Sequence, residues 1–149
     1  MRLEEELKQR KPFSNEREKL VVNSIYTGLW LNSLLIDKLK KFNLNDQHYN
    51  ILRILRGRYP EHALTMEIKE VLLNKRGDLT RQLEKLVKLE LIRREVNPSN
   101  KTQIFSFITQ KGLDTLDEIH EIHDYSVVYN NVSKEEAELA NEILDKLRG

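Results

Sequence analysis

The chain has 149 residues, of which 39% are hydrophobic and 33% are charged, and this balance fits one globular domain with a buried core. No apolar run is long enough to span a membrane and no secretory signal opens the sequence, so we expect a cytoplasmic protein. The absence of cysteine excludes disulfides, thiolate metal sites and cysteine-based redox sensing.

The net charge of +1 conceals an uneven distribution of charge along the sequence. Residues 74–102 contain eight basic and four acidic side chains, a net charge of +4. Residues 114–149 contain three basic and ten acidic side chains, a net charge of −7. This asymmetry indicates a surface for an anionic polymer in one part of the chain only.

The N-terminal third predicts one long helix. Residues 1–13 are charged and are read as a frayed arm or a short extra helix. Asn15 and Glu18 form a possible capping box at the start of a helix over 14–42. Its apolar residues occupy more of the surface than one stripe requires, which predicts that a second subunit covers part of this helix.

Two shorter helices and a tight turn follow. The first helix begins after Asn45 and ends before Pro60, and Thr65 is expected to cap the second. A turn over 74–77 then leads to a third helix, for which Asp78 is the predicted N-cap. This succession is typical of a helix-turn-helix.

The third helix has two unlike faces. Leu79, Leu83 and Leu86 recur at helical spacing on one side. The opposite side carries Asp78, Arg81, Lys85 and Lys88. A solvated face is the commoner explanation of any single amphipathic helix, but the positive charge gathered over 74–102 favours a functional surface here.

After Leu91 the apolar residues no longer recur at helical spacing, and the sequence predicts a β-hairpin. Residues 91–96 and 102–109 are rich in strand-favouring side chains, and polar turn residues over 97–101 separate them. A basic helix followed directly by a hairpin is read as a recognition helix and a wing. The predicted fold is therefore mainly α with a small β-hairpin wing.

The acidic C-terminal part predicts two further helices. Thr109 is expected to cap a helix that continues through Val127, and Ser133 with Glu136 forms a capping box for the last one. These helices are expected to interlock with the long first helix and its symmetry mate in a dimer.

Several segments together resemble the MarR family of bacterial transcriptional regulators. The resemblance lies in 78–86, 91–94, 97–98 and 108–112, and upstream 47–55 and 65–68 resemble the two helices that precede the recognition helix in that family. It implies a single MarR-like domain over 1–149, with dimerisation helices at 14–42 and 110–148 and a winged helix-turn-helix lobe at 45–109. No single segment would suffice alone.

The resemblance implies a homodimer that binds double-stranded DNA at a near-palindromic operator, with the recognition helix in the major groove and the wing tip in a neighbouring minor groove. Arginine and lysine suit guanine edges and phosphates, which agrees with this reading. The implied DNA-binding residues are Thr65, Arg76, Asp78, Thr80, Arg81, Lys85, Lys88, Arg94, Asn100, Lys101 and Thr102.

Two departures from the family pattern predict weaker or differently shaped DNA binding. The family usually has Asp, a basic residue and Arg at the wing tip, where this chain has Asn100, Lys101 and Thr102. The carboxylate that would pair with Arg94 is therefore missing. Glu90 stands where the family commonly has glycine, and a left-handed conformation there would cost about 1 kcal/mol.

The favoured function is a ligand-responsive transcriptional regulator, read as a repressor. The alternatives are a winged-helix protein-interaction module without specific DNA binding and a metal-responsive regulator. An enzyme is not expected, because the sequence contains no Gly-rich phosphate cradle, nucleophile elbow or metal-protease helix.

Aromatic residues and histidines offer two further candidate sites. Tyr26, Trp30, His48 and Tyr49 could line a pocket for a small aromatic effector, although plain core packing is the commoner role of such residues. His120 and His123 lie on one helix face, expected to project inward; they are weak metal candidates, and hydrogen-bonded interface histidines are the preferred reading. We expect no cofactor.

Overall fold

The computed structural model describes residues 2–122 and 126–149, and it is mainly α-helical with one small antiparallel sheet. The helices are α1 (Leu3–Glu6), α2 (Glu16–Leu39), α3 (Asp46–Arg58), α4 (Thr65–Val71), α5 (Leu79–Lys88), α6 (Gln110–Ile122), α7 (Ser126–Tyr129) and α8 (Lys134–Arg148), with a 3-10 turn η1 (Lys40–Phe42). The strands are β1 (Ala63–Leu64), β2 (Ile92–Asn97) and β3 (Asn100–Ile108). The predicted fold class is confirmed.

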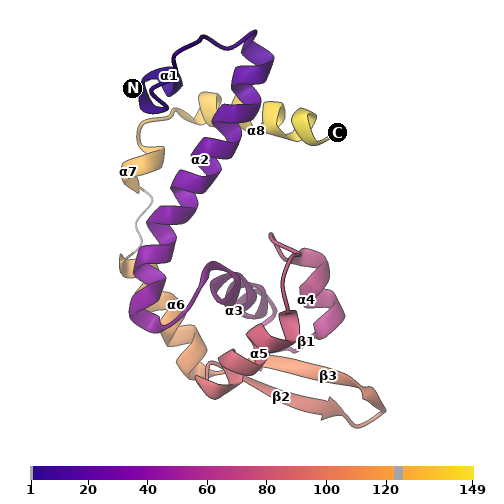
Figure 1. Ribbon diagram of the computed structural model, residues 1–149. Helices are drawn as coiled ribbons and strands as arrows, with labels where there is room; N and C mark the ends of the chain where they lie inside the picture. Colours follow the sequence, from indigo (N-terminus) through magenta and orange to yellow (C-terminus); the bar gives the residue numbers. More distant parts are fainter. Residues whose placement is uncertain (1, 123–125) are drawn as a thin grey trace.

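Helix α2 connects two parts of the molecule (Figure 1). One end of α2 lies beside α1, and the other end adjoins α3, α6 and the lobe formed by α3, α4, α5 and the sheet, which we call the winged lobe. The side chain of Asn15 accepts a hydrogen bond from the Glu18 amide at 2.9 Å, which confirms the predicted N-cap. The helix ends at Leu39, and η1 completes the segment predicted to extend to residue 42.

The hydrophobic core fills the winged lobe and its junction with α2 and α6. The largest fully buried apolar side chains are Leu39, Ile51, Leu52, Leu55, Ile68, Leu83, Leu86, Ile92 and Ile119. They come from α2, α3, α4, α5, β2 and α6, so burial of their apolar surface fixes the recognition helix against the rest of the lobe.

The sheet differs from the predicted hairpin in two respects. Strand β1, which the sequence did not predict, pairs with β3 through Ala63 and Ser106. The strands also extend further toward the tip than expected, so that Asn97 and Asn100 pair directly and the turn is shorter than 97–101. Two residues are too few to form a recognisable period, which explains why β1 was missed.

Two predicted helix starts are confirmed and one is wrong. The Ser133 hydroxyl accepts from the Glu136 amide at 3.2 Å, and the Thr109 hydroxyl accepts from the Gly112 amide at 3.0 Å. Thr65 does not cap α4, because Leu64 is the N-cap residue and its amide donates to the Glu67 carboxylate at 2.7 Å.

The two ends of the chain leave apolar side chains exposed. Ile25 on α2 is 59% exposed and Leu139 on α8 is 58% exposed. Every residue of α8 is exposed, although α8 carries an apolar stripe. Within the described ranges, no helix combines the length and apolar character that a membrane span requires.

Candidate nucleic-acid interface

Helix α5 is anchored by its leucines and presents its charged side outward. Leu83 and Leu86 are completely buried, whereas Arg81 and Lys88 are exposed. The Asp78 carboxylate accepts from the Arg81 amide at 3.1 Å, which confirms Asp78 as the N-cap of α5. An exposed cationic face on a rigidly packed helix can reach phosphates and base edges.

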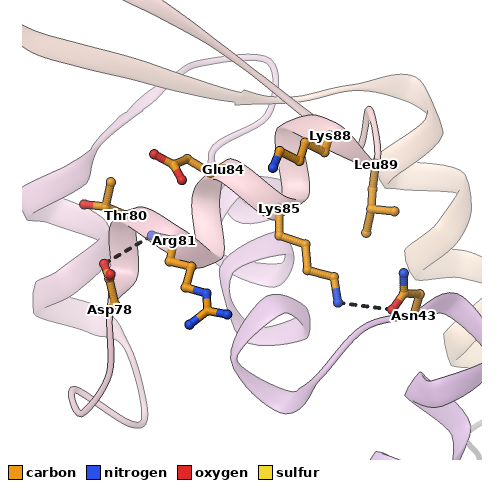
Figure 2. A pocket seen from close by; sticks show the side chains of 8 residues that line it. All are labelled: Asn43, Asp78, Thr80, Arg81, Glu84, Lys85, Lys88 and Leu89. Atoms are coloured by element: carbon orange, nitrogen blue, oxygen red, sulfur yellow. Dashed lines mark hydrogen bonds between the residues drawn. The ribbon is translucent and has the colours of Figure 1, made fainter.

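An open hollow of about 640 Å³ lies along α5. It is lined by Asn43, Asp78, Thr80, Arg81, Glu84, Lys85, Lys88 and Leu89. Figure 2 shows that the side chains of Arg81 and Lys85 extend to one side of the helix, whereas those of Thr80, Glu84 and Lys88 extend to the other. The structure thus brings five predicted DNA-binding residues of α5 and its cap together at one surface.

Four amide side chains, at Asn43, Asn45, Gln47 and Asn50, connect the start of α3 to the recognition helix and its preceding loop; we call them the amide row. The Lys85 ammonium donates to the Asn43 side-chain oxygen at 3.1 Å. The Asn45 side chain donates to the Gln82 side chain at 3.2 Å. These two bonds join α5 to the segment between α2 and α3.

The other half of the amide row holds the loop between α4 and α5. The Gln47 side chain donates to the carbonyl oxygens of Asn74 and Arg76, at 3.4 Å and 3.3 Å. The Asn50 side chain accepts from the Leu73 amide at 2.9 Å. The loop is otherwise exposed, so these bonds are what fastens it to α3, and they determine where the backbone of Arg76 lies.

Arg94 lies on β2, the strand that is in contact with the recognition helix α5. Its guanidinium donates to the Thr65 hydroxyl at 3.2 Å, so two predicted DNA-binding residues contact each other. Its Nε is buried and has no hydrogen-bond partner among the described residues. Together with Glu84, Val87 and Lys88, Arg94 lines a second open hollow of about 340 Å³ between α5 and the wing.

The wing tip is held by a local hydrogen-bonded turn. The Asn100 side-chain oxygen accepts from the Thr102 amide at 3.1 Å and from the Thr102 hydroxyl at 2.7 Å. Lys101, between them, is exposed. Lys101 is the one basic residue over 97–102, so the tip presents a single cation beside two polar residues that are bonded to each other.

Glu90 has the left-handed conformation expected at the end of the recognition helix, with φ of 61°. Its carboxylate lies 3.1 Å from the Lys111 ammonium, and its carbonyl oxygen accepts from the Thr109 hydroxyl at 2.7 Å. These contacts with the start of α6 offset part of the backbone strain that glycine would avoid.

The four residues predicted to line an effector pocket do not share one cavity. Tyr26 and Trp30 line a hollow of about 400 Å³ between α1 and α2. Tyr49 lines a different hollow of about 430 Å³, between α2, α3 and the loop before α5. His48 is only 2% exposed and belongs to the core.

Burial lowers the pKa of His48 from 6.5 to about 4, and the positive charge of Lys85 acts in the same direction. Its Nδ1 accepts from the Asn45 amide at 3.0 Å. A neutral imidazole is therefore built into the first turn of α3.

The metal candidates receive no support from the described residues. His120 is exposed, which contradicts the expectation that it projects inward, and His123 lies outside the described residues. Across 2–122 and 126–149, no three His, Asp or Glu side chains form a group that could hold a metal ion.

Glu84 and the amide row were missing from the sequence-based site. Four amides within eight residues, Asn43 to Asn50, were a visible signal, but the partners of these amides lie 23 to 42 positions away. Glu84 was counted only as a charge, although its exposed position on α5 could have placed it at the interface.

The packed leucines, the exposed cations of α5 and the adjacent hairpin define a winged helix-turn-helix protein. No family model matches the chain. It is 26% identical over 132 residues to the HTH-type transcriptional regulator MhqR of Bacillus subtilis, covering 86% of this chain and 87% of that protein. This likeness and the fold comparisons below confirm the resemblance to the MarR family.

Solved structures of MarR-type regulators share the fold. A mutant of MarR from E. coli in complex with operator DNA has a TM-score of 0.76 and 21% identity, over 92% of this chain and 99% of that one. The organohalide-sensing RdhR regulator in its 2,4-dichlorophenol-bound form has a TM-score of 0.78 and 18% identity, over 94% of this chain and 86% of that one. The chain has the MarR fold, and its relatives are transcriptional regulators.

Proposed function

We propose that this protein is a transcriptional regulator that binds double-stranded operator DNA as a homodimer, acting as a ligand-responsive repressor. The observation that carries the proposal is the exposed cationic face of α5, centred on Arg81 and Lys88, opposite completely buried leucines. Each cation that meets a phosphate releases counterions, so this face favours DNA in a salt-dependent manner. Such a regulator acts where the bacterial chromosome lies, in the cytoplasm.

The wing supports the same function. Lys101 at its tip is an exposed cation, and Lys88 on α5 is an exposed cation that lines the hollow between α5 and the wing. A helix fits the major groove of B-DNA, and a hairpin tip with one cation suits the electronegative minor groove beside it. In this arrangement α5 reads bases and the wing contributes one electrostatic contact.

The homodimer is supported by the exposed apolar surfaces of α2 and α8. Ile25 and Leu29 are 59% and 66% exposed on α2, and Leu139 is 58% exposed on α8. A second copy would cover these side chains by exchanging the same surfaces across a two-fold axis. The axis would place two α5 helices on successive major grooves, roughly 34 Å apart.

The effector proposal rests on the hollow that Tyr49 lines. Its volume of about 430 Å³ suits a small aromatic molecule. Arg53 lies over the Tyr49 ring, 5.8 Å from its centroid, and both residues line the hollow, so an aromatic acid or phenol would find a ring and a cation there. Gln47 and Asn50 line the same hollow, so a bound molecule would lie against the amide row.

The test is fluorescence anisotropy of the purified protein with its own upstream promoter duplex and with a scrambled duplex, over a salt series. We expect a preference of roughly a thousandfold for the promoter, with log affinity falling linearly in log salt. Equal weak binding to both duplexes would contradict specific recognition of that promoter and would favour a protein-interaction module.

A further inference from the structure

The recognition helix carries an acidic side chain in the middle of its cationic surface. Glu84 is exposed and lines both hollows, the one along α5 and the one between α5 and the wing. Figure 2 shows its carboxylate extending outward between Thr80 and Lys88. Glu84 therefore lies, together with Lys88, on the part of the α5 surface that separates the two hollows.

The carboxylate of Glu84 is not neutralised by its neighbours. Among the described residues, no ion pair and no side-chain hydrogen bond involves Glu84. Lys88, one turn later, is the nearest cation in the sequence on that side of the helix, yet the two form no salt bridge. The acid therefore has its hydrogen-bonding capacity free.

A free carboxylate has few favourable partners on DNA. Phosphates repel it, and guanine N7 and O6 and thymine O4 are acceptors like itself. The amino group of cytosine, N4, is the major-groove donor that a carboxylate suits best. Because Glu84 lies between the two hollows, it would meet base edges in the groove floor, whereas Lys85, which is bonded to Asn43 on one flank, is nearer to the backbone.

We propose that Glu84 is a specificity-determining residue that accepts a hydrogen bond from the N4 amino group of one cytosine in each half-site. The proposal rests on the proposed function, because it requires α5 to enter the major groove. It assigns Glu84 a role opposite to that of its cationic neighbours, which attract any duplex. The carboxylate weakens attraction to all DNA and favours sites with cytosine at one position.

The test is selection of bound duplexes from a random library with the parent protein, Glu84→Gln and Glu84→Ala, followed by anisotropy on single-base variants of the selected site. For the parent we expect one cytosine per half-site whose replacement by thymine weakens binding about 10-fold to 100-fold. Glu84→Gln should shift the preference at that position toward adenine, which a glutamine reads through N6 and N7. Glu84→Ala should abolish the preference at that position alone.

Glu118→Gln is the matched control, because it removes the same charge from an exposed residue of α6, away from α5. It should leave the selected sequence unchanged. If Glu84→Gln keeps every base preference of the parent and binds all duplexes more tightly by one factor, Glu84 faces the backbone and the proposal is overturned. A parent protein that selects no sequence would overturn the proposed function itself. Thermal unfolding of each variant verifies that the fold is retained.

Discussion

The ammonium of Lys85 lies 3.1 Å from the side-chain oxygen of Asn43, so a cation of the recognition helix is bonded to the residue that ends the turn after α2. Asn43 itself has the left-handed conformation, with φ of 56°. This contact turns the side chain of Lys85 to one flank of α5, away from Glu84 and Lys88 (Figure 2). Lys85 is thereby held on a flank in the C-terminal half of α5, where a side chain meets the sugar-phosphate backbone before it meets a base edge.

We therefore predict that Lys85→Met weakens binding to every duplex by a similar factor and reduces the slope of log affinity against log salt by about one unit. The measurement is anisotropy over a salt series with promoter and scrambled duplexes. A loss confined to the promoter duplex would show that Lys85 reads a base.

Arg81 and Lys101 should respond differently to truncation. Arg81→Ala is expected to lower affinity for the preferred duplex by about 1–3 kcal/mol and to relax base preference at one position, because Arg81 lies in the first turn of α5, where a recognition helix contacts base edges. Lys101→Ala should weaken binding uniformly and reduce the salt slope by about one unit, because the wing tip supplies a single exposed cation. If both variants bind like the parent, the assignment of recognition helix and wing is wrong.

Gln47→Leu tests whether the amide row positions the loop before α5. The change removes two hydrogen bonds, to the carbonyl oxygens of Asn74 and Arg76, each contributing about 1 kcal/mol. We expect faster hydrogen exchange over 73–77 and about 10-fold weaker operator binding, with an unchanged salt slope because no cation is lost.

Gln110→Leu is the matched control, because the side chain of Gln110 bonds only locally, to Asp114 at 2.7 Å. It should change neither exchange over 73–77 nor affinity. Loss of affinity in Gln47→Leu without faster exchange would argue against control of the loop by the amide row.

His48 should make the fold sensitive to acid. Because burial lowers its folded-state pKa to about 4, the unfolded chain binds a proton more readily between pH 6.5 and 4. The free energy of unfolding should be unaffected by His48 above pH 6.5 and should fall as pH drops through this window, by roughly 3 kcal/mol at most. Urea unfolding from pH 7 to 4 measures this, and His48→Gln should remove that part of the dependence; an identical profile in the variant would refute the assignment.

Ile25→Glu should prevent dimer formation. The side chain is 59% exposed in one copy of the chain, and its burial against a second copy would leave a glutamate unpaired in an apolar contact. Light scattering coupled to gel filtration should give a dimer for the parent and a monomer for the variant. Val96→Glu makes the same kind of change, from an apolar to an acidic side chain, at a residue that is 56% exposed on β2, and this variant should remain dimeric. If the Ile25→Glu protein is still a dimer, the dimer interface does not include this part of α2.

The sequence by itself determined α2 to α5, the last helix α8 and the two-faced character of α5, but it predicted one helix through Val127 where the structure has α6 ending at Ile122 and α7 over Ser126–Tyr129. Capping bonds join residues three positions apart, as at Asn45 and His48, and the leucine period of α5 repeats within single turns. Such signals are local, so they can be read without knowing the fold. The resemblance to the MarR family added the roles of these elements.

The tertiary structure decided which side chains meet across long separations. The bond between Asn43 and Lys85 spans 42 positions, and that between Arg94 and Thr65 spans 29. The burial of His48 and the placement of Tyr26 and Tyr49 in separate hollows also depend on how α2 and α3 pack. Contacts of this kind follow from collective burial of the core, which no local pattern encodes.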